Sequence, residues 1–124
     1  MAQLIDQATF FEKYNIKEED FSNTKLTWKE LSNIYNDYLK KIPHLEEAAI
    51  SIFRSLSKMP HVHSVRYRVK DAEHLIEKII RKKGENPERK ITIATYLTEI
   101  TDLIGIRVLH LFKEEWVTIH QNII

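Results

Sequence analysis

The first half of the chain has apolar residues at helical spacing. The apolar cluster around Phe10 and Phe11 predicts a short helix over residues 7–14, followed by a loop. Thr27-Trp-Lys-Glu30 has the form of a capping box and predicts a helix that ends near Lys41. Pro43 is expected to break or restart the helix, and a second helix should then reach about Lys58. The residues expected to face the core are Trp28, Leu31, Ile34, Tyr35, Tyr38 and Leu39 in the first helix and Leu45, Ala48, Ala49, Ile52, Phe53 and Leu56 in the second.

The pattern changes after a predicted turn over residues 59–61. Residues 62–69 alternate between apolar and polar, which predicts a strand with Arg66, Arg68 and Lys70 on one face. Asp71 then stands where the N-cap of a helix is expected, and Gly84 is placed to close that helix.

The helix after Asp71 is predicted to be amphipathic. His74, Lys78 and Arg81 recur at i, i+4 and i+7, so they share one face. The opposite face is an apolar stripe of Leu75, Ile76, Ile79 and Ile80. The strand and the helix therefore direct cations the same way across one tight turn, which suits a polyphosphate.

The last third of the chain predicts a second strand. Residues 92–100 do not favour either a helix or a strand, whereas residues 103–112 are apolar on both faces except for Arg107 and His110. This composition predicts a central strand in a covered sheet, and residues 113–124 are expected to begin a helix. The order of elements predicts a mixed α/β layer fold with one domain. In it, residues 1–60 form a helical segment and residues 61–124 belong to the α/β core.

Composition and charge narrow the functional classes. The 124 residues carry a net charge of +1, but residues 66–90 hold nine Lys and Arg against five Asp and Glu. A concentrated basic patch favours a discrete anionic ligand, and a solvated surface is the alternative. The chain has no cysteine, no apolar run of membrane-spanning length and no signal-peptide pattern, so we expect a cytoplasmic protein without membrane contact. With two glycines, the chain has no glycine-rich phosphate loop.

The segment Asp102-Leu-Ile-Gly-Ile-Arg107 is a second candidate for chemistry. An acidic residue at the mouth of a strand is suited to hold Mg²⁺ together with nucleotide phosphates. Arg107 in a buried strand needs an anionic partner, and a structural ion pair with Glu99 or Asp102 is the alternative interpretation. The spacing of His61 and His63 is more typical of exposed or packing residues than of a metal site.

These motifs, in their order along the chain, resemble the RelA/SpoT synthetase domain, a (p)ppGpp synthetase fold of the nucleotidyltransferase class. The resemblance lies in Arg68-x-Lys70, in Lys78 and Arg81 on the following helix, and in Asp102-Leu-Ile-Gly-Ile-Arg107. It covers about residues 27–124, and its specific part is residues 66–107. It implies a nucleotidyltransferase-like mixed sheet flanked by helices, with an amino-terminal helical pair.

The resemblance also implies a reaction and a role for each residue. The family transfers the β,γ-pyrophosphoryl unit of ATP to the 3′-hydroxyl of GDP or GTP in the stringent response. Asp102 would be the catalytic residue that holds Mg²⁺, and Arg107 would lie on the acceptor side or support Asp102. The residues that would bind ATP are Arg68, Lys70, His74, Lys78 and Arg81.

The sequence departs from the family pattern in the phosphate turn and at its end. Asp71 and His74 stand where the family has small hydroxyl residues, and Asp71 should weaken ATP binding unless it caps the helix or faces the metal. The guanine-stacking Tyr and the catalytic Glu of the family would come after Ile124, so the domain is expected to be incomplete at its carboxy terminus and this chain to be an inactive fragment.

Two other functions remain open. Some relatives act as toxins on other acceptors, such as adenine nucleotides or the 3′ end of tRNA. The extra cations Arg66, Lys82, Lys83, Arg89 and Lys90 would suit a nucleic-acid acceptor. The second alternative is a non-catalytic module that binds a nucleotide or a partner. Members of the family commonly self-associate, so a homo-oligomer is a further expectation.

Overall fold

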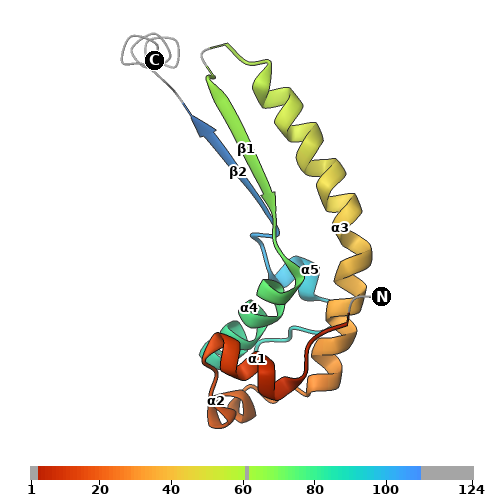
Figure 1. The fold of residues 1–124 in the computed structure, drawn as a ribbon, viewed down its shortest axis with the longest axis vertical. Helices are drawn as coiled ribbons and strands as arrows, with labels where there is room; N and C mark the ends of the chain where they lie inside the picture. Colours follow the sequence, from red (N-terminus) through yellow and green to blue (C-terminus); the bar gives the residue numbers. More distant parts are fainter. Residues whose placement is uncertain (1–2, 61, 110–124) are drawn as a thin grey trace. The chain divides into compact units, whose positions relative to one another are not determined.

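The structure is a computed structural model that describes residues 3–60 and 62–109 (Figure 1). Its contacts divide the chain into two compact units. The helical unit is Met1–Ile42 with Lys70–Leu103, and the hairpin unit is Pro43–Val69 with Ile104–Ile124. Residues 110–112 of the predicted strand and the predicted helix over 113–124 lie outside the described residues. The described elements are helices and a two-stranded antiparallel sheet, so the expected mixed α+β class is confirmed.

The helical unit begins with two short helices. Helix α1, Gln7–Tyr14, confirms the prediction, and Asp6 caps it by accepting a hydrogen bond from the backbone N–H of Thr9 at 3.0 Å. Helix α2, Glu18–Asn23, lies where a loop was predicted. Three acidic residues occupy its first turn, where their negative charges interact favourably with the positive end of the helix dipole. Phe21 is its buried residue.

Helix α3, Trp28–Ser57, runs from the helical unit into the hairpin unit. The N-cap half of its capping box is confirmed at Thr27, whose hydroxyl accepts from the Glu30 N–H at 3.2 Å. The predicted break at Pro43 is wrong, because Pro43 lies inside the helix. Proline has a φ compatible with a helix and removes only one backbone hydrogen bond, so a long helix can contain it at a local cost. Ala48 and Ile52, expected to face the core, are exposed.

Helix α4, Ala72–Glu85, provides the main apolar face of the helical unit. The side chains of Leu75, Ile76 and Ile79 are fully buried, as the periodicity predicted. The Asp71 N-cap is also confirmed, since its carboxylate accepts from the N–H groups of Glu73 at 3.1 Å and His74 at 3.3 Å.

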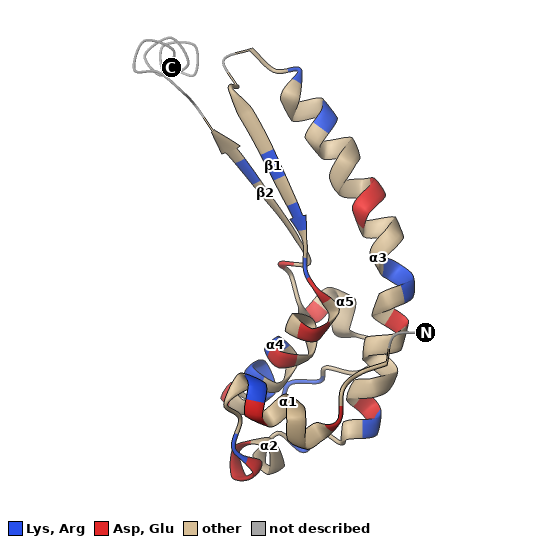
Figure 2. Cartoon of the chain, viewed as in Figure 1, with Lys and Arg blue, Asp and Glu red and all other residues tan. Residues whose placement is uncertain are grey.

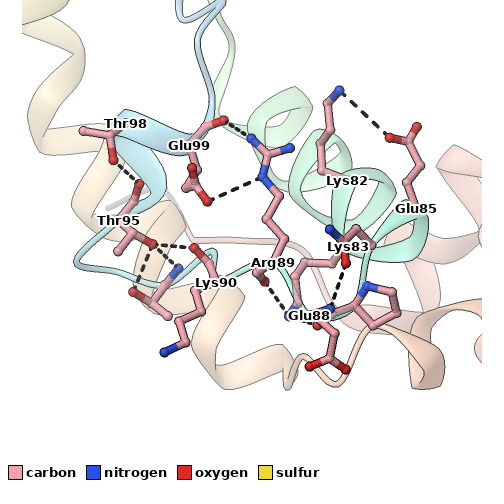
Figure 3. Close-up of polar contacts among 12 residues, drawn as sticks. Lys82, Lys83, Glu85, Glu88, Arg89, Lys90, Thr95, Thr98 and Glu99 are labelled. Carbon is pink, nitrogen blue, oxygen red and sulfur yellow. Dashed lines mark hydrogen bonds and ion pairs between the residues drawn. The ribbon is translucent and has the colours of Figure 1, made fainter.

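The end of α4 differs from the prediction. Gly84 lies inside the helix, Asn86 is the C-cap, and no glycine of the described chain has a positive φ. The buried Lys83 shapes the next loop by donating to the backbone carbonyls of Pro87 at 2.7 Å and Arg89 at 2.8 Å (Figure 3). Helix α5, Tyr96–Glu99, follows in the segment whose sequence was ambiguous.

The hairpin unit contains strands β1, Ser64–Val69, and β2, Ile104–Leu109, paired antiparallel (Figure 1). Phe53 of α3 packs edge-on against Tyr67 of β1, with ring centroids 5.7 Å apart. The prediction of a covered central strand is not met in the described part of the chain. Ile106 is 36% exposed and Leu109 is 50% exposed, since β2 has β1 as its one described neighbour.

Candidate functional site

Three predicted site residues meet in the helical unit, and we call them the Asp102 cluster: Lys70, Lys78 and Asp102. The ammonium of Lys70 lies 3.3 Å from Asp102 Oδ2, and that of Lys78 lies 2.6 Å from Oδ1. The lysine side chains are only 11% and 15% exposed, whereas the Asp102 side chain is 45% exposed. Two cations therefore share one carboxylate at the edge of the unit, and the cluster carries a net positive charge.

Backbone contacts bring these residues together from distant parts of the sequence. The N–H of Lys70 donates to the carbonyl of Leu103 at 2.7 Å, which places Lys70 against the segment that carries Asp102. The Asp71 cap then starts α4 at once, so Lys78 follows two turns into that helix. The tight turn thus has a local cause in the sequence, a capping aspartate directly after the strand.

The two carboxylate oxygens of Asp102 lie in different environments. Oδ1 is buried, and no described residue donates a hydrogen bond of acceptable geometry to it. The Lys78 ammonium is close to Oδ1 but off the angle of a hydrogen bond, so we treat their contact as ionic. Burial acts to raise the pKa of Asp102, but the ammonium groups of Lys78 and Lys70 outweigh it and hold that pKa below its ordinary value. Asp102 is therefore ionised at neutral pH.

The donor set of the cluster fits a Mg²⁺ ion that arrives with phosphates. In proteins Mg²⁺ commonly uses one or two carboxylates and takes its other ligands from phosphate oxygens and water. Asp102 supplies one carboxylate, with a buried oxygen that lacks a directed donor. No group of three or more His, Cys, Asp or Glu suited to a metal occurs in the described residues, so a site made of protein ligands alone is not found there.

The second set of predicted residues lies on the hairpin, and we call it the arginine face: Arg66, Arg68 and Arg107. Arg66 is directly opposite Arg107 in the antiparallel register, and Arg68 is opposite Gly105. All three are exposed, and they line one hollow with Tyr67, Gly105 and Ile106. Figure 2 shows Lys and Arg on both strands of the hairpin.

The arginine face differs from what was expected of Arg107. The sequence predicted a buried arginine with an anionic partner, but Arg107 is exposed. The two acids proposed as partners pair elsewhere, Glu99 with Arg89 and Asp102 with the two lysines (Figure 3 shows the first pair). Like charges directly opposite in a sheet are unfavourable, so the Arg66–Arg107 pairing costs stability unless an anion lies over it.

The remaining predicted residues, His74 and Arg81, are exposed on α4. The His74 ring lies 3.5 Å from the Asp71 carboxylate and packs edge-on against Tyr14, with centroids 5.9 Å apart. Among the described residues, neither His74 nor Arg81 forms an ion pair with Asp102. The structure thus brings Lys70, Lys78 and Asp102 together and leaves these two on the helix surface.

Sequence reasoning missed two groups of residues near the cluster. Tyr38, assigned only to the apolar stripe, donates its hydroxyl to the carbonyl of Lys70 at 2.6 Å. Glu73 accepts from Lys13 at 2.5 Å and from the Tyr14 hydroxyl at 2.8 Å, which joins α1 to the start of α4. No local pattern announces either contact, because the partners are about 30 and 60 residues apart.

Residues 67–124 match the family model described as a region found in RelA / SpoT proteins. We call this segment, which is similar to that family model, the RelA/SpoT region. The RelA/SpoT region contains the whole Asp102 cluster and two members of the arginine face, so the resemblance expected from these motifs is confirmed for this segment. Neither the curated proteins nor the solved structures contain a match to the chain. No described helix has the length and apolar character needed to cross a membrane.

Proposed function

We propose that the RelA/SpoT region binds ATP with Mg²⁺ and transfers its β,γ-pyrophosphoryl unit to the 3′-hydroxyl of GDP or GTP. The observation that supports this proposal is the convergence of Lys70 and Lys78 on Asp102 inside one compact unit. Pyrophosphoryl transfer needs positioned cations and a metal-binding carboxylate more than it needs covalent chemistry from the protein. The Asp102 cluster supplies both kinds of group.

The proposed donor-side roles follow from these positions. Lys70 and Lys78 would bind the phosphates of ATP, and Asp102 would hold the metal as the catalytic carboxylate. A bound Mg²⁺ supplies neutralisation of charge on the phosphate oxygens. His74 and Arg81 are exposed on α4, so they are accessible to the phosphates or the adenine of ATP. Asp71 caps the helix, and this is one of the two conditions under which its charge was not expected to weaken ATP binding.

Two arginines of the arginine face have proposed roles that come from the family resemblance. Arg68 is proposed to contact ATP, and Arg107 to lie on the acceptor side or to support Asp102.

In the reaction, the 3′-oxygen of the acceptor bonds to the β-phosphorus of ATP and the bond from that phosphorus to the AMP oxygen breaks. The acceptor hydroxyl releases its proton to solvent. Cations near both substrates lower the cost of bringing these anions together.

The exposed arginine face also supports a second candidate function. An acceptor larger than GDP, such as the 3′ end of tRNA, needs accessible cations, and Arg66, Arg68 and Arg107 are all accessible. Under this alternative the donor site is unchanged, and an adenine nucleotide or tRNA replaces GDP. A module that binds a nucleotide without catalysis is the third candidate. Nucleotide substrates are consistent with a cytoplasmic location, which we propose as well.

Transfer of radiolabel from γ-labelled ATP tests the proposal. Because this chain is expected to be an inactive fragment, the complete gene product is incubated with Mg²⁺, labelled ATP and, separately, GDP, GTP, unlabelled ATP or tRNA. We expect label on GDP or GTP, and we expect Asp102→Asn to lose it while Asp20→Asn, an exposed acid on α2, does not. Label on tRNA or an adenine nucleotide would favour the second candidate function, in which that molecule is the acceptor. ATP-dependent thermal stabilisation without transfer would favour the binding module, and its absence in both wild type and Lys70→Ala would exclude ATP as a ligand.

A further inference from the structure

Tyr38 on α3 is bound to the backbone of the proposed phosphate-binding Lys70. Its side chain is fully buried, and its hydroxyl donates to the carbonyl of Lys70 at 2.6 Å. The N–H of the same Lys70 donates to the carbonyl of Leu103 at 2.7 Å. Both backbone polar groups of Lys70 therefore have partners from other segments of the helical unit, at the point where the chain turns from β1 into α4.

We propose that Tyr38 is a positioning residue that fixes the backbone of Lys70 and thereby directs its ammonium group toward Asp102 and bound phosphate. This inference rests on the proposed function for its catalytic meaning, but the contact itself does not. Tyr38 also lies outside residues 67–124, so the RelA/SpoT region would depend on α3 for the placement of one of its own cations.

The environment of Tyr38 makes its hydroxyl a permanent donor. Burial, together with the charges of Asp71 and Asp102, raises the pKa of Tyr38 to about 12. The hydroxyl therefore stays protonated over the physiological pH range. A buried tyrosine hydroxyl needs a hydrogen-bond acceptor. Because the acceptor here is a carbonyl 32 residues away, the bond is a tertiary contact and not part of a local turn.

The core around Tyr38 offers a matched control in Tyr96. Tyr96 is also fully buried, its hydroxyl donates to the carboxylate of Asp37, and its ring packs edge-on against Tyr38 with centroids 6.3 Å apart. Tyr96→Phe and Tyr38→Phe each remove one buried hydroxyl and one hydrogen bond from the same core. Of the two tyrosine hydroxyls, that of Tyr38 donates to Lys70 and that of Tyr96 donates to Asp37.

Amide hydrogen exchange tests the positioning without any ligand. We expect Tyr38→Phe to speed exchange at the Lys70 amide by about fivefold beyond the change in global stability, since one hydrogen bond is worth about 1 kcal/mol. Tyr96→Phe should change that amide only in proportion to global stability. Equal effects of both substitutions at the Lys70 amide would overturn the proposal.

A double-mutant cycle on Mg·ATP binding tests whether Tyr38 acts through Lys70. By calorimetry, Tyr38→Phe should weaken binding by about fivefold in the wild-type background and have no further effect with Lys70→Ala. The same loss in both backgrounds would mean a general structural role and would overturn the proposal. If the wild-type protein does not bind Mg·ATP, the proposed function fails, and the exchange experiment alone decides the positioning.

If the Tyr38→Phe protein does not fold, a measurement on the unaltered chain tests the proposal instead. With tyrosines labelled at Cζ, addition of Mg·ATP should shift the resonance of Tyr38 and leave that of Tyr96 in place. A Tyr38 resonance that stays fixed at saturating Mg·ATP would contradict the coupling between the hydroxyl and Lys70.

Discussion

The helical unit and the hairpin unit use their charges in opposite ways. Every ion pair and every side-chain hydrogen bond found among residues 3–60 and 62–109 lies in the helical unit. The hairpin unit instead exposes Arg66, Arg68 and Arg107, two of them directly opposite each other. Charges that are paired within the protein stabilise the fold. Exposed like charges that lie opposite each other repel, so they favour the binding of an external anion.

Within the helical unit the paired cations again fall into two kinds. Lys83 is buried and donates to two backbone carbonyls of the loop after α4, so its partners are structural. Lys78, five residues earlier, contacts a carboxylate that is about half exposed, and we propose that a phosphate replaces this contact. A run of basic residues on one helix therefore contains both a structural lysine and a candidate ligand-binding lysine.

Asp102→Asn gives the largest expected effect. Loss of the one carboxylate in the cluster should lower pyrophosphoryl transfer by about 100-fold or more, in line with the removal of a single group that stabilises the transition-state charge. Steady-state transfer rates from labelled ATP, measured with the complete gene product, report this change, with Asp20→Asn as the matched control. Transfer within a few fold of wild type in Asp102→Asn would remove the cluster from catalysis.

Lys83→Met tests the structural half of the comparison. The substitution leaves the carbonyls of Pro87 and Arg89 without their donor, and we expect the free energy of unfolding to fall by about 2 kcal/mol. Chemical denaturation measures the change, and Lys82→Met, whose ammonium lies 4.0 Å from Glu85, should cost less than about 0.5 kcal/mol. Equal losses for the two variants would mean that Lys83 is not a structural residue.

Arg66→Ala tests the exposed half. Removing one of two facing arginines should leave the free energy of unfolding within about 0.5 kcal/mol of wild type or raise it slightly, more so at low salt. Binding of tRNA, the acceptor in the second candidate function, should weaken by about tenfold, because an accessible cation is lost. Arg54→Ala, an exposed arginine on α3, is the control for both measurements. Lower stability with unchanged binding would reverse the assignment of the arginine face.

Glu73→Gln gives the smallest expected effect and depends on pH. The hydrogen bond from Lys13 lowers the pKa of Glu73 from its ordinary value of 4.5, with a further contribution from the Tyr14 hydroxyl. A lowered pKa contributes stability that is complete above pH 4.5 and is lost as pH falls through the folded-state value. Wild type and Glu73→Gln should therefore differ in melting temperature at pH 7 and converge below pH 4.5. A difference that persists unchanged in acid would contradict the ionic contact.

The local features of this fold could be predicted because their causes are local. The capping residues Thr27 and Asp71 and the apolar stripe of α4 follow from side chains within one or two turns of each other. The same holds for the cation spacing around the turn at Lys70, which placed Lys70 and Lys78 together, whereas Asp102 joined them in one candidate site through the resemblance to the RelA/SpoT synthetase domain. These three residues also lie in the segment that matches the RelA/SpoT family model.

The features that could not be predicted depend on distant partners. Pro43 continues a helix because the turns on both sides of it remain helical, which a local rule about proline does not include. The role of the Tyr38 hydroxyl depends on a carbonyl 32 residues away, and an apolar stripe conceals it. Arg107 was expected in a covered strand, but its exposure depends on which elements surround β2 and not on its own sequence.

Calorimetric titration of Mg·ATP into wild type, Lys78→Ala and Lys82→Ala tests the central claim most directly. The two lysines lie four residues apart on α4, but only Lys78 contacts Asp102. We expect Lys78→Ala to weaken Mg·ATP binding by about tenfold or more and Lys82→Ala to leave it within about twofold. Equal weakening by both substitutions, or none by Lys78→Ala, would contradict the assignment of the Asp102 cluster as the ATP site.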